Sequence, residues 1–402
     1  MRILVFNCGS SSLKFELVEL DTGLVSRRTL ARGAVEEIGR QARYAFHAGP
    51  AGGAPATGNK PLGDHAGAAC FALDWLESSL GAPLRRLDGC AHRVVHGGER
   101  LVAPALVGDE TIAAIEQASV FAPLHNPAAL AVVRAAGERL AGVRAVVVTD
   151  TAFHQTMPEH AQSYALPRSL AARRGIRRFG FHGIGHAYML ERYAELTGVA
   201  PEQLDLVTLQ LGAGCSACAV AAGRSVDTSM GLTPLEGLMM ARRSGDLDPA
   251  IVGYLARSEK LSLAEVERLL DEQSGLLGVS ELSADMRELE AEAARDPQGP
   301  AALAIRMFCY RVRKYIGAYL AVLGGADAVI FAGGIGEHSA LVRAEVCAGL
   351  KRLGIILDPG KNATAGAGEA SISTDDSPVK VQVIPLDEEL YIARAAARLL
   401  AG

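Results

Sequence analysis

The sequence feature that most constrains the fold is an order of segments that occurs twice. At the start, the apolar run RILVF precedes the loop NCGSSS, the alternating segment LKFELVEL, the turn DTG and the segment LVSRRTL. Near residue 205, DLVTLQ, LGAG, CSACAVA, the turn AGR and SVDTSM repeat this order. Each set predicts strand, glycine-rich loop, strand, tight turn and strand. The copies lie about two hundred residues apart, which indicates a duplicated domain rather than a solenoid.

A helix and a strand follow in each copy. Residues 126–140 have helical apolar spacing and precede a strand that ends at Asp150, and the predicted helix 301–323 precedes a strand that ends in glycines. Strand–helix–strand order predicts parallel pairing, so each domain should hold a mixed sheet with ligands at the carboxyl ends of its strands. We expect a domain boundary near residue 151, and exposed excursions at 47–61 and 365–373.

Composition narrows the class of protein. The 402 residues are 49% hydrophobic, enough for two cores, and the net charge of −5 does not favour nucleic acid or an anionic membrane as partner. No apolar stretch approaches the roughly 18 residues of a membrane span, and MRILVFNCG turns polar too early for a signal peptide. Seven scattered cysteines indicate a reducing compartment rather than a disulfide framework. We therefore expect a cytoplasmic protein.

The first glycine-rich loop has the composition of a phosphate site. In NCGSSSLKF, glycine allows close backbone approach, serines add donors and Lys14 adds charge. It is not a P-loop, because a P-loop has a second glycine before the lysine and a helix after it. A turn without a ligand is the alternative for this stretch alone, but the matching loop near residue 212 favours phosphate. A third glycine-rich turn at 332–339 lies at a strand end, where a nucleotide would bind.

Arginines stand beside Gly-His turns in AHRVVHGGER and RRGIRRFGFHGIGH, and beside a Ser-Gly turn in ARRSGDLDP. Arginine in such places suits bidentate capture of carboxylate or phosphate, although a solvated face is the simpler explanation for RRGIRR alone. His182 and His186 have the i, i+4 spacing of a metal pair, but the two glycines between them and the missing Glu argue against zinc. Cys215 and Cys218 are expected to be structural.

Taken together, the motifs resemble the acetate/propionate kinase family of the actin-like ATPase superfamily, nearly end to end. The stretches that carry the resemblance are NCGSSSLKF, RVVHGG, APLHNP, TDTAFHQTMP, RRFGFHGIGH, MGLTPLEGLMM, RSGDLDP, GGIGE and EELYIAR. The resemblance implies an α/β fold of two duplicated ribonuclease-H-like domains, each with a central mixed sheet, an interdomain cleft and a homodimer. The first domain would be 1–150 joined by the C-terminal helix 388–402, and the second, nucleotide-binding domain would be 151–387.

The resemblance also implies roles for individual residues. The catalytic set would be Asp150, His182, Arg243 and Arg93. Acetate or acetyl phosphate would be held by Arg93, Val95, Leu124, His125, Phe181 and Pro234. ATP or ADP would be held by Lys14, Ser10, Ser12, Gln210, Leu211, Gly212, Ala213, Gly214, Asp285, Met286, Arg287, Gly333, Gly334, Ile335, Gly336 and Glu337. Mg²⁺, with Mn²⁺ as an alternative, would be held by Asn7 and Glu388. In relatives that prefer propionate the valine tends to be smaller, so Val95 favours acetate.

The chemistry suits these roles. Acetate is ionised at pH 7 and needs no general base, so catalysis should be positioning and charge stabilisation by Arg, His and Mg²⁺. We expect Asp150 to organise the metal and its waters rather than to accept a proton.

The sequence departs from the family pattern mainly among the residues expected to contact the nucleotide. The second loop usually reads HLGNGSS; here it is QLGAGCS, and Arg242, His338 and Asp387 also differ from the usual residues. Two alternatives to an ATP-dependent acetate kinase therefore stand: the same fold with another phosphoryl donor such as pyrophosphate, and a weakly catalytic sensor of acetyl phosphate or nucleotide. The intact acyl-side residues argue against the sensor, because a binder has no use for transition-state groups.

Overall fold

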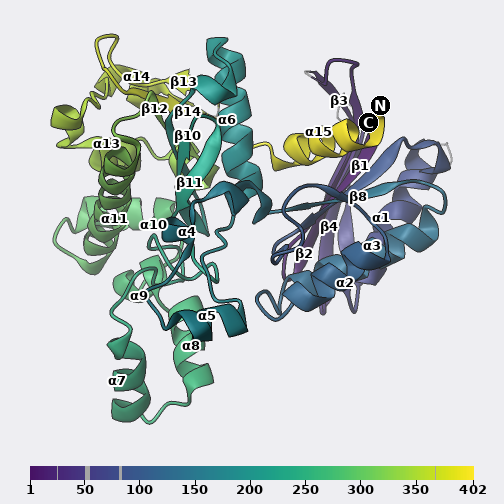
Figure 1. The fold of residues 1–402 in the computed structure, drawn as a ribbon, viewed down its shortest axis with the longest axis horizontal. Coiled ribbons are helices and arrows are strands. Elements are labelled where there is room, and N and C mark those ends of the chain that lie inside the picture. Colours follow the sequence, from purple (N-terminus) through teal and green to yellow (C-terminus); the bar gives the residue numbers. More distant parts are fainter. Residues whose placement is uncertain (25, 50–54, 81–83, 367) are drawn as a thin grey trace. The chain divides into compact units, whose positions relative to one another are not determined.

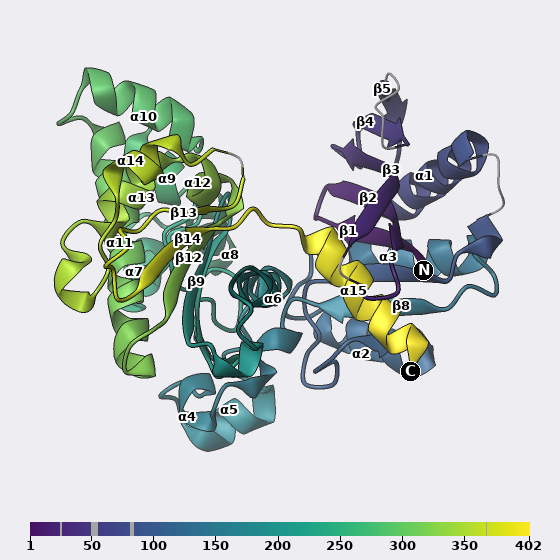
Figure 2. The same cartoon turned by 90° about the horizontal axis from the view of Figure 1, so that it is seen from above.

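The computed structural model describes residues 1–24, 26–49, 55–80, 84–366 and 368–402, and the chain forms two compact units (Figures 1 and 2). Unit 1 comprises Met1–Phe153 and Asp387–Gly402, and unit 2 comprises His154–Leu386. The chain thus enters unit 2 once and returns to unit 1 for its last helix.

Unit 1 is built on a mixed sheet of eight strands within the described residues. Their order across the sheet is β5 (Ala56–Pro61), β4 (Gln41–Ala48), β3 (Arg27–Glu36), β2 (Ser12–Leu20), β1 (Arg2–Cys8), β6 (Gly89–Val94), β8 (Ala145–Thr149) and β7 (Ala105–Leu106). β1 through β5 pair antiparallel, whereas β1, β6 and β8 run parallel. The carboxyl ends of the three parallel strands therefore meet at one edge of the sheet.

Helices cover both faces of this sheet. One face packs Leu4 and Phe6 into a core with the apolar sides of α1 (His65–Leu80) and α3 (Asn126–Arg139), and α2 (Asp109–Ala118) packs against α3. The other face, which bears Ile3, packs against α15 (Glu388–Ala401), which contacts β1, β6 and β8. Figure 2 shows α15 lying along this sheet. Because both faces are covered, β1 is a nearly continuous apolar run, as buried parallel strands require.

Unit 2 holds the second mixed sheet, with six strands among the described residues. Their order is β11 (Arg224–Thr228), β10 (Cys215–Ala221), β9 (Leu206–Leu211), β12 (Ala328–Ala332), β14 (Lys380–Val383) and β13 (Ala370–Ser371). The helices are α4 (Glu159–Gln162), α5 (Arg168–Arg174), α6 (Gly183–Thr197), α7 (Ala250–Ser258), α8 (Leu263–Glu272), α9 (Gly275–Ser280), α10 (Met286–Arg295), α11 (Pro300–Leu323), α12 (Gly333–His338), α13 (Ala340–Cys347) and α14 (Pro359–Thr364). α6 contacts β9, and α11 contacts β10.

The two sheets share one strand order, which confirms the predicted duplication and mixed pairing. In each, a central strand pairs antiparallel with the next strand, which pairs antiparallel with the one after it. On its other side the central strand pairs parallel with a later strand, which pairs parallel with one more. β4 and β5 extend the first sheet only. The predicted pairing of the second halves is wrong by one strand, because β12 lies beside β9 as β6 lies beside β1. The glycines after β12 thus correspond to those of VVHGGE after β6. The sequence of a helix followed by a strand does not show whether that strand will pair with the central strand, as β12 does, or with the strand beyond it, as β8 does.

Four local predictions also need correction. Within the predicted excursion 47–61, β5 pairs with β4, and residues 50–54 lie outside the described residues. In 365–373, residue 367 lies outside them, and Ile372 is fully buried. The third strand, predicted at 24–30, is β3 at Arg27–Glu36. The predicted turn at 332–339 is instead the short helix α12. None of the described helices combines the length and apolar character needed to cross a membrane.

Candidate functional site

The carboxyl ends of the parallel strands in unit 1 bring together a charged cluster. The Arg93 guanidinium pairs with the Asp150 carboxylate, with Nη2 at 2.6 Å and Nε at 3.2 Å from Oδ2, and its Nη1 donates to Oδ1 of Asn7 at 3.0 Å. The Asn7 amide donates in turn to Glu388 at 3.3 Å and Glu389 at 3.0 Å, on the first turn of α15. The structure therefore places the predicted Asn7, Arg93, Asp150 and Glu388 in one network.

Burial controls the charges of this network. Asp150 is 1% exposed, and burial raises the pKa of its carboxyl, while the Arg93 guanidinium opposes that rise. The negative charges of Asp150 and Glu388 raise the pKa of Arg93 despite its burial, so the guanidinium stays charged. The contacts above occupy three of the five N–H groups of Arg93, which leaves two for a ligand carboxylate.

The donors of this cluster fit a hard divalent cation. Among the described residues, no group of three or more His, Cys, Asp or Glu is placed to hold a metal. Mg²⁺, however, usually binds through one or two carboxylates, waters and substrate phosphates rather than an all-protein cage. The carboxylates of Glu388 and Glu389, which both accept from the Asn7 amide, match that pattern. Glu389 was not predicted, although its position next to Glu388 in EELYIAR was a signal.

The first glycine-rich loop is the turn between β1 and β2. The Gly9 N–H donates to the Ser12 carbonyl at 2.9 Å, which closes the turn, and a ring nitrogen of His65 lies 3.0 Å from the Gly9 carbonyl. Ser10 is exposed, and so is Lys14, which lies opposite Asn7 in the β1–β2 register. The turn thus leaves a cation and a hydroxyl accessible beside the charged cluster.

The residues predicted for the acyl group are divided between the units. In unit 1, Val95 is 7% exposed, His125 precedes α3, and Leu124 is 68% exposed. In unit 2, Phe181 is 1% exposed, and the Pro234 carbonyl lies 3.3 Å from Nη1 of Arg243. The structure brings Pro234 to Arg243. Val95, Leu124 and His125 belong to unit 1, and Phe181 belongs to unit 2.

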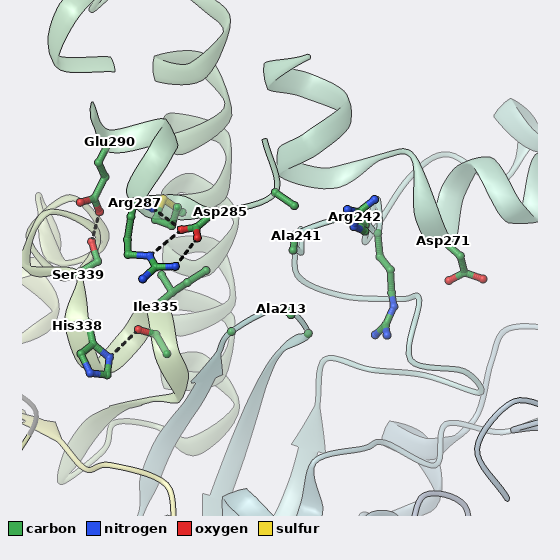
Figure 3. Close-up of a pocket in the computed structure, with 16 residues that line it drawn as sticks. Ala213, Ala241, Arg242, Asp271, Asp285, Arg287, Glu290, Ile335, His338 and Ser339 are labelled. Carbon is green, nitrogen blue, oxygen red and sulfur yellow. Dashed lines mark hydrogen bonds and ion pairs between the residues drawn. The ribbon is translucent and has the colours of Figure 1, made fainter. Parts of the chain in front are cut away.

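Unit 2 has a cavity of about 770 Å³ beside its sheet (Figure 3). That volume lies within the range of ligand pockets. Its lining is Gly212, Ala213, Gly214, Ala241, Arg242, Arg243, Asp271, Ala284, Asp285, Met286, Arg287, Glu290, Gly334, Ile335, His338 and Ser339. Eight of the predicted nucleotide residues are therefore here, together with the departures Arg242 and His338.

The turn between β9 and β10 forms the part of the cavity nearest the ends of these strands. The Gly212 N–H donates to the Gly214 carbonyl at 3.1 Å between β9 and β10, and the Ala213 carbonyl accepts from the Ala241 N–H at 3.2 Å. Before this turn, the Gln210 side chain lies over α6, where a Cβ on Gly185 would come within 2.0 Å of Gln210 Oε1. Gly185 thus makes room for the unusual Gln210.

The glycines after β12 form the first residues of α12. Gly333 has φ +77°, and a Cβ there would lie 2.6 Å from the Leu211 carbonyl, so this position requires glycine. Oε1 of Glu337 accepts from the N–H of Gly333 at 2.8 Å and from that of Leu386 at 3.1 Å. Glu337, predicted to contact nucleotide, thus joins the start of α12 to the backbone at Leu386.

An ion pair stands on the cavity wall at the start of α10. The Asp285 side chain caps the helix by accepting from the Arg287 N–H at 2.9 Å and also pairs with the Arg287 guanidinium (Figure 3). These hydrogen bonds lower the pKa of Asp285. The Arg287 side chain is 88% exposed and lines the cavity, so it is accessible to a ligand there.

His182 and Arg243 converge on the Gly214 turn. A Cβ on Gly214 would lie 3.4 Å from Nε2 of His182 and 3.6 Å from Nη1 of Arg243. His182 has φ +58° and is the residue before α6, so its ring is presented at the helix N-terminus. Its Nδ1 lies 2.9 Å from Oγ of Ser216, a residue that sequence analysis did not single out.

Comparison with known proteins assigns the family. The family model described as Acetokinase family matches residues 2–394. The chain belongs to the acetokinase family. A protein named acetate kinase from Solibacter usitatus is 46% identical to it over 411 residues, covering 100% of this chain and 99% of that protein.

Solved structures agree with the acetokinase assignment. The crystal structure of Porphyromonas gingivalis acetate kinase has a TM-score of 0.92 and 39% identity over 99% of each chain. That of a propionate kinase from Francisella tularensis has a TM-score of 0.89 and 36% identity over 98% of each chain. The predicted family, the α/β fold with two mixed sheets and the assignment to an enzyme class, the kinases, are confirmed.

Proposed function

We propose that this chain catalyses reversible transfer of the γ-phosphoryl group of ATP to acetate, giving acetyl phosphate and ADP. An acetate oxygen forms a bond to the γ-phosphorus, and the bond to the β,γ-bridging oxygen breaks, its electron pair leaving with ADP. Membership of the acetokinase family supports this reaction. The observation that carries the residue assignment is the convergence of His182 and Arg243 on the Gly214 turn, at the edge of a nucleotide-sized cavity.

In unit 1 we assign the acceptor and metal groups. The two remaining N–H directions of Arg93 would bind the acetate carboxylate, and Val95, Leu124 and His125 would contact the acyl group. Asn7, Glu388 and Glu389 would hold Mg²⁺, which neutralises phosphate charge when bound, and Asp150 would orient it and its waters. Lys14, Ser10 and Ser12 would contact phosphate oxygens.

In unit 2 we assign the donor groups. The Gly212–Gly214 turn and α12 would hold the phosphates, while Asp285–Arg287 would contact the nucleoside. His182 and Arg243 would stabilise charge on the transferred phosphoryl group, and Phe181 and Pro234 would contact the acyl methyl. The missing side-chain donor at Ala213 weakens nucleotide binding without abolishing it, since backbone N–H groups remain. A cytoplasmic homodimer stays a prediction.

The test is acetyl phosphate formation, trapped as the hydroxamate, from acetate with Mg²⁺-ATP or with Mg²⁺-pyrophosphate. We expect turnover with ATP that Arg243→Ala abolishes. Turnover with pyrophosphate alone would replace the donor in this proposal. Tight binding of acetyl phosphate without turnover would contradict the enzymatic assignment.

A further inference from the structure

Behind His182, buried polar side chains form a chain of hydrogen bonds. Oγ of Ser216 lies 2.9 Å from Nδ1 of His182 and 2.8 Å from Nε2 of His186, whose Nδ1 lies 2.7 Å from Oγ1 of Thr208. Ser216, His186 and Thr208 are all 0% exposed. This series of hydrogen bonds therefore runs from Thr208 in the interior of unit 2 to the ring of His182, a proposed catalytic residue.

The local fold explains why these residues meet. Thr208 on β9 lies opposite Cys218 of β10, two residues from Ser216, so both hydroxyls lie on one face of the sheet. α6 packs against β9, and the four-residue spacing of His182 and His186 puts both rings over the same strip. The spacing considered for zinc thus places both rings on one serine hydroxyl.

Charge considerations set the direction of the hydrogen bonds. Burial, with help from His154 and His182, holds the pKa of His186 well below its ordinary value, so the ring is neutral and has one N–H. His182 precedes α6, where the partial positive charge of the helix N-terminus disfavours an imidazolium, and the Arg243 guanidinium approaches Gly214 as the His182 ring does. A neutral His182 must then have its proton on either Nδ1 or Nε2.

One direction suits an anionic ligand. When Thr208 donates to His186, His186 donates to Ser216 and Ser216 donates to Nδ1 of His182, the His182 proton is on Nε2, the atom near the Gly214 turn. The reverse direction would point an Nε2 lone pair at phosphate oxygens, which is repulsive. We propose that Ser216 and His186 are positioning residues that hold His182 as a neutral imidazole with its Nε2–H directed at the transferred phosphoryl group. This inference rests on the proposed function and adds the origin of the donor proton.

A double-mutant cycle tests the coupling. We expect Ser216→Ala to lower kcat for acetyl phosphate formation by about tenfold, the upper range for a lost hydrogen bond between neutral groups, with both KM values within about twofold. In a His182→Ala background the same change should have no further effect, because it acts through that ring. Equal losses in both backgrounds would mean that Ser216 only supports the fold, and would overturn the proposal. Ser377→Ala removes another buried hydroxyl of unit 2 outside the cavity lining and serves as control.

A spectroscopic measurement on the intact wild-type chain tests the protonation directly. In histidine-¹⁵N-labelled protein, with His182 signals identified by their loss in His182→Ala, we expect a proton on Nε2 and none on Nδ1 at pH 7. An Nδ1–H tautomer or an imidazolium would overturn the inference even if the enzyme is active. A wild-type chain that forms no acetyl phosphate would contradict the proposed function instead, and the two failures are thus distinguishable.

Discussion

The two units have one strand order but carry different chemistry at the carboxyl ends of their strands. In unit 1 these ends bear Asn7, Arg93 and Asp150, whereas in unit 2 the matching strands lead into the Gly212–Gly214 turn and into Gly333. The shared topology determines where a ligand can bind. The residue types at the strand ends determine what is bound. Unit 1 presents charged side chains there, and unit 2 presents backbone N–H groups of glycine-rich turns.

The difference has an energetic consequence. A buried charge such as that of Asp150 needs a partner, and removing one partner leaves the other uncompensated. A glycine turn offers N–H groups and close approach without burying a charge. Unit 1 should therefore be sensitive to changes of charge, and unit 2 to changes of shape and hydrogen bonding.

Arg243 is the strongest test of this contrast, because its charged group approaches the Gly214 turn of unit 2, whose other donors are backbone N–H groups. Arg243→Ala should lower kcat by about 10³-fold or more, as for arginines that stabilise a phosphoryl transition state, with little change in nucleotide affinity. Steady-state kinetics and ATP titration measure both. Arg242→Ala, at the adjacent residue of the cavity lining, is the matched control and should cost only a few fold. Equal losses in the two variants would remove the special role of Arg243.

Acid should destabilise both units, since each holds a buried neutral histidine. Burial lowers the pKa of His92 in unit 1 and of His154 in unit 2 to about 4. Folding lowers both pKa values, so protons bind the unfolded chain first as the pH falls below about 6.5. The free energy of unfolding is therefore greatest above pH 6.5 and decreases as the pH falls toward 4, by roughly 3 kcal/mol for each histidine.

Urea unfolding at pH 7 and pH 4.5 measures this loss. Within the described residues, Nδ1 of His92 has no hydrogen-bond partner, so His92→Leu should reduce the acid sensitivity at little cost at pH 7. The exposed His160 provides the control His160→Gln, which should leave the free energy of unfolding unchanged at pH 7 and at pH 4.5. An unchanged acid loss in His92→Leu would show that this ring is not a source of it.

Ala213→Asn adds a side-chain donor to the turn of unit 2 and should tighten ATP binding about tenfold, since a hydrogen bond to a charged group contributes about 1.5–3 kcal/mol. Calorimetric titration with ATP and ADP measures the effect. Ala284→Asn, on the cavity wall outside the turn, should not reproduce it. Unchanged affinity would mean that Gln210 and its neighbours already compensate for the missing donor.

The smallest effect should come from Val95→Ala in unit 1, a change of shape on the charged side. Removing two methyl groups enlarges the acyl site and should shift the ratio of kcat/KM values toward propionate by about fourfold, near the free energy of one buried methylene. Competition between acetate and propionate measures the ratio. A constant ratio would exclude Val95 from the acyl pocket.

Strands and hairpins were predictable where period and turn residues coincide, as in CSACAVA, which is β10 without a residue's error. The correspondence between β12 and β6 was not predictable, because it depends on which strand each one pairs with in the folded sheet. Residue identity also indicated Arg93 and Asp150 but not their ion pair, since strands 57 residues apart supply its partners. Ser216 gave no signal, because its role depends on two rings that the sequence places thirty residues or more away.

Glu337 links the nucleotide side of unit 2 to the end of that unit. One carboxylate oxygen accepts from the amides of Gly333 and Leu386, and the next residue, Asp387, begins the return to unit 1. The two amides therefore share a single acceptor and cannot open independently of it. In hydrogen exchange, Gly333 and Leu386 should behave as one cooperative element, slowed together when ligand holds α12 and released together when that helix frays.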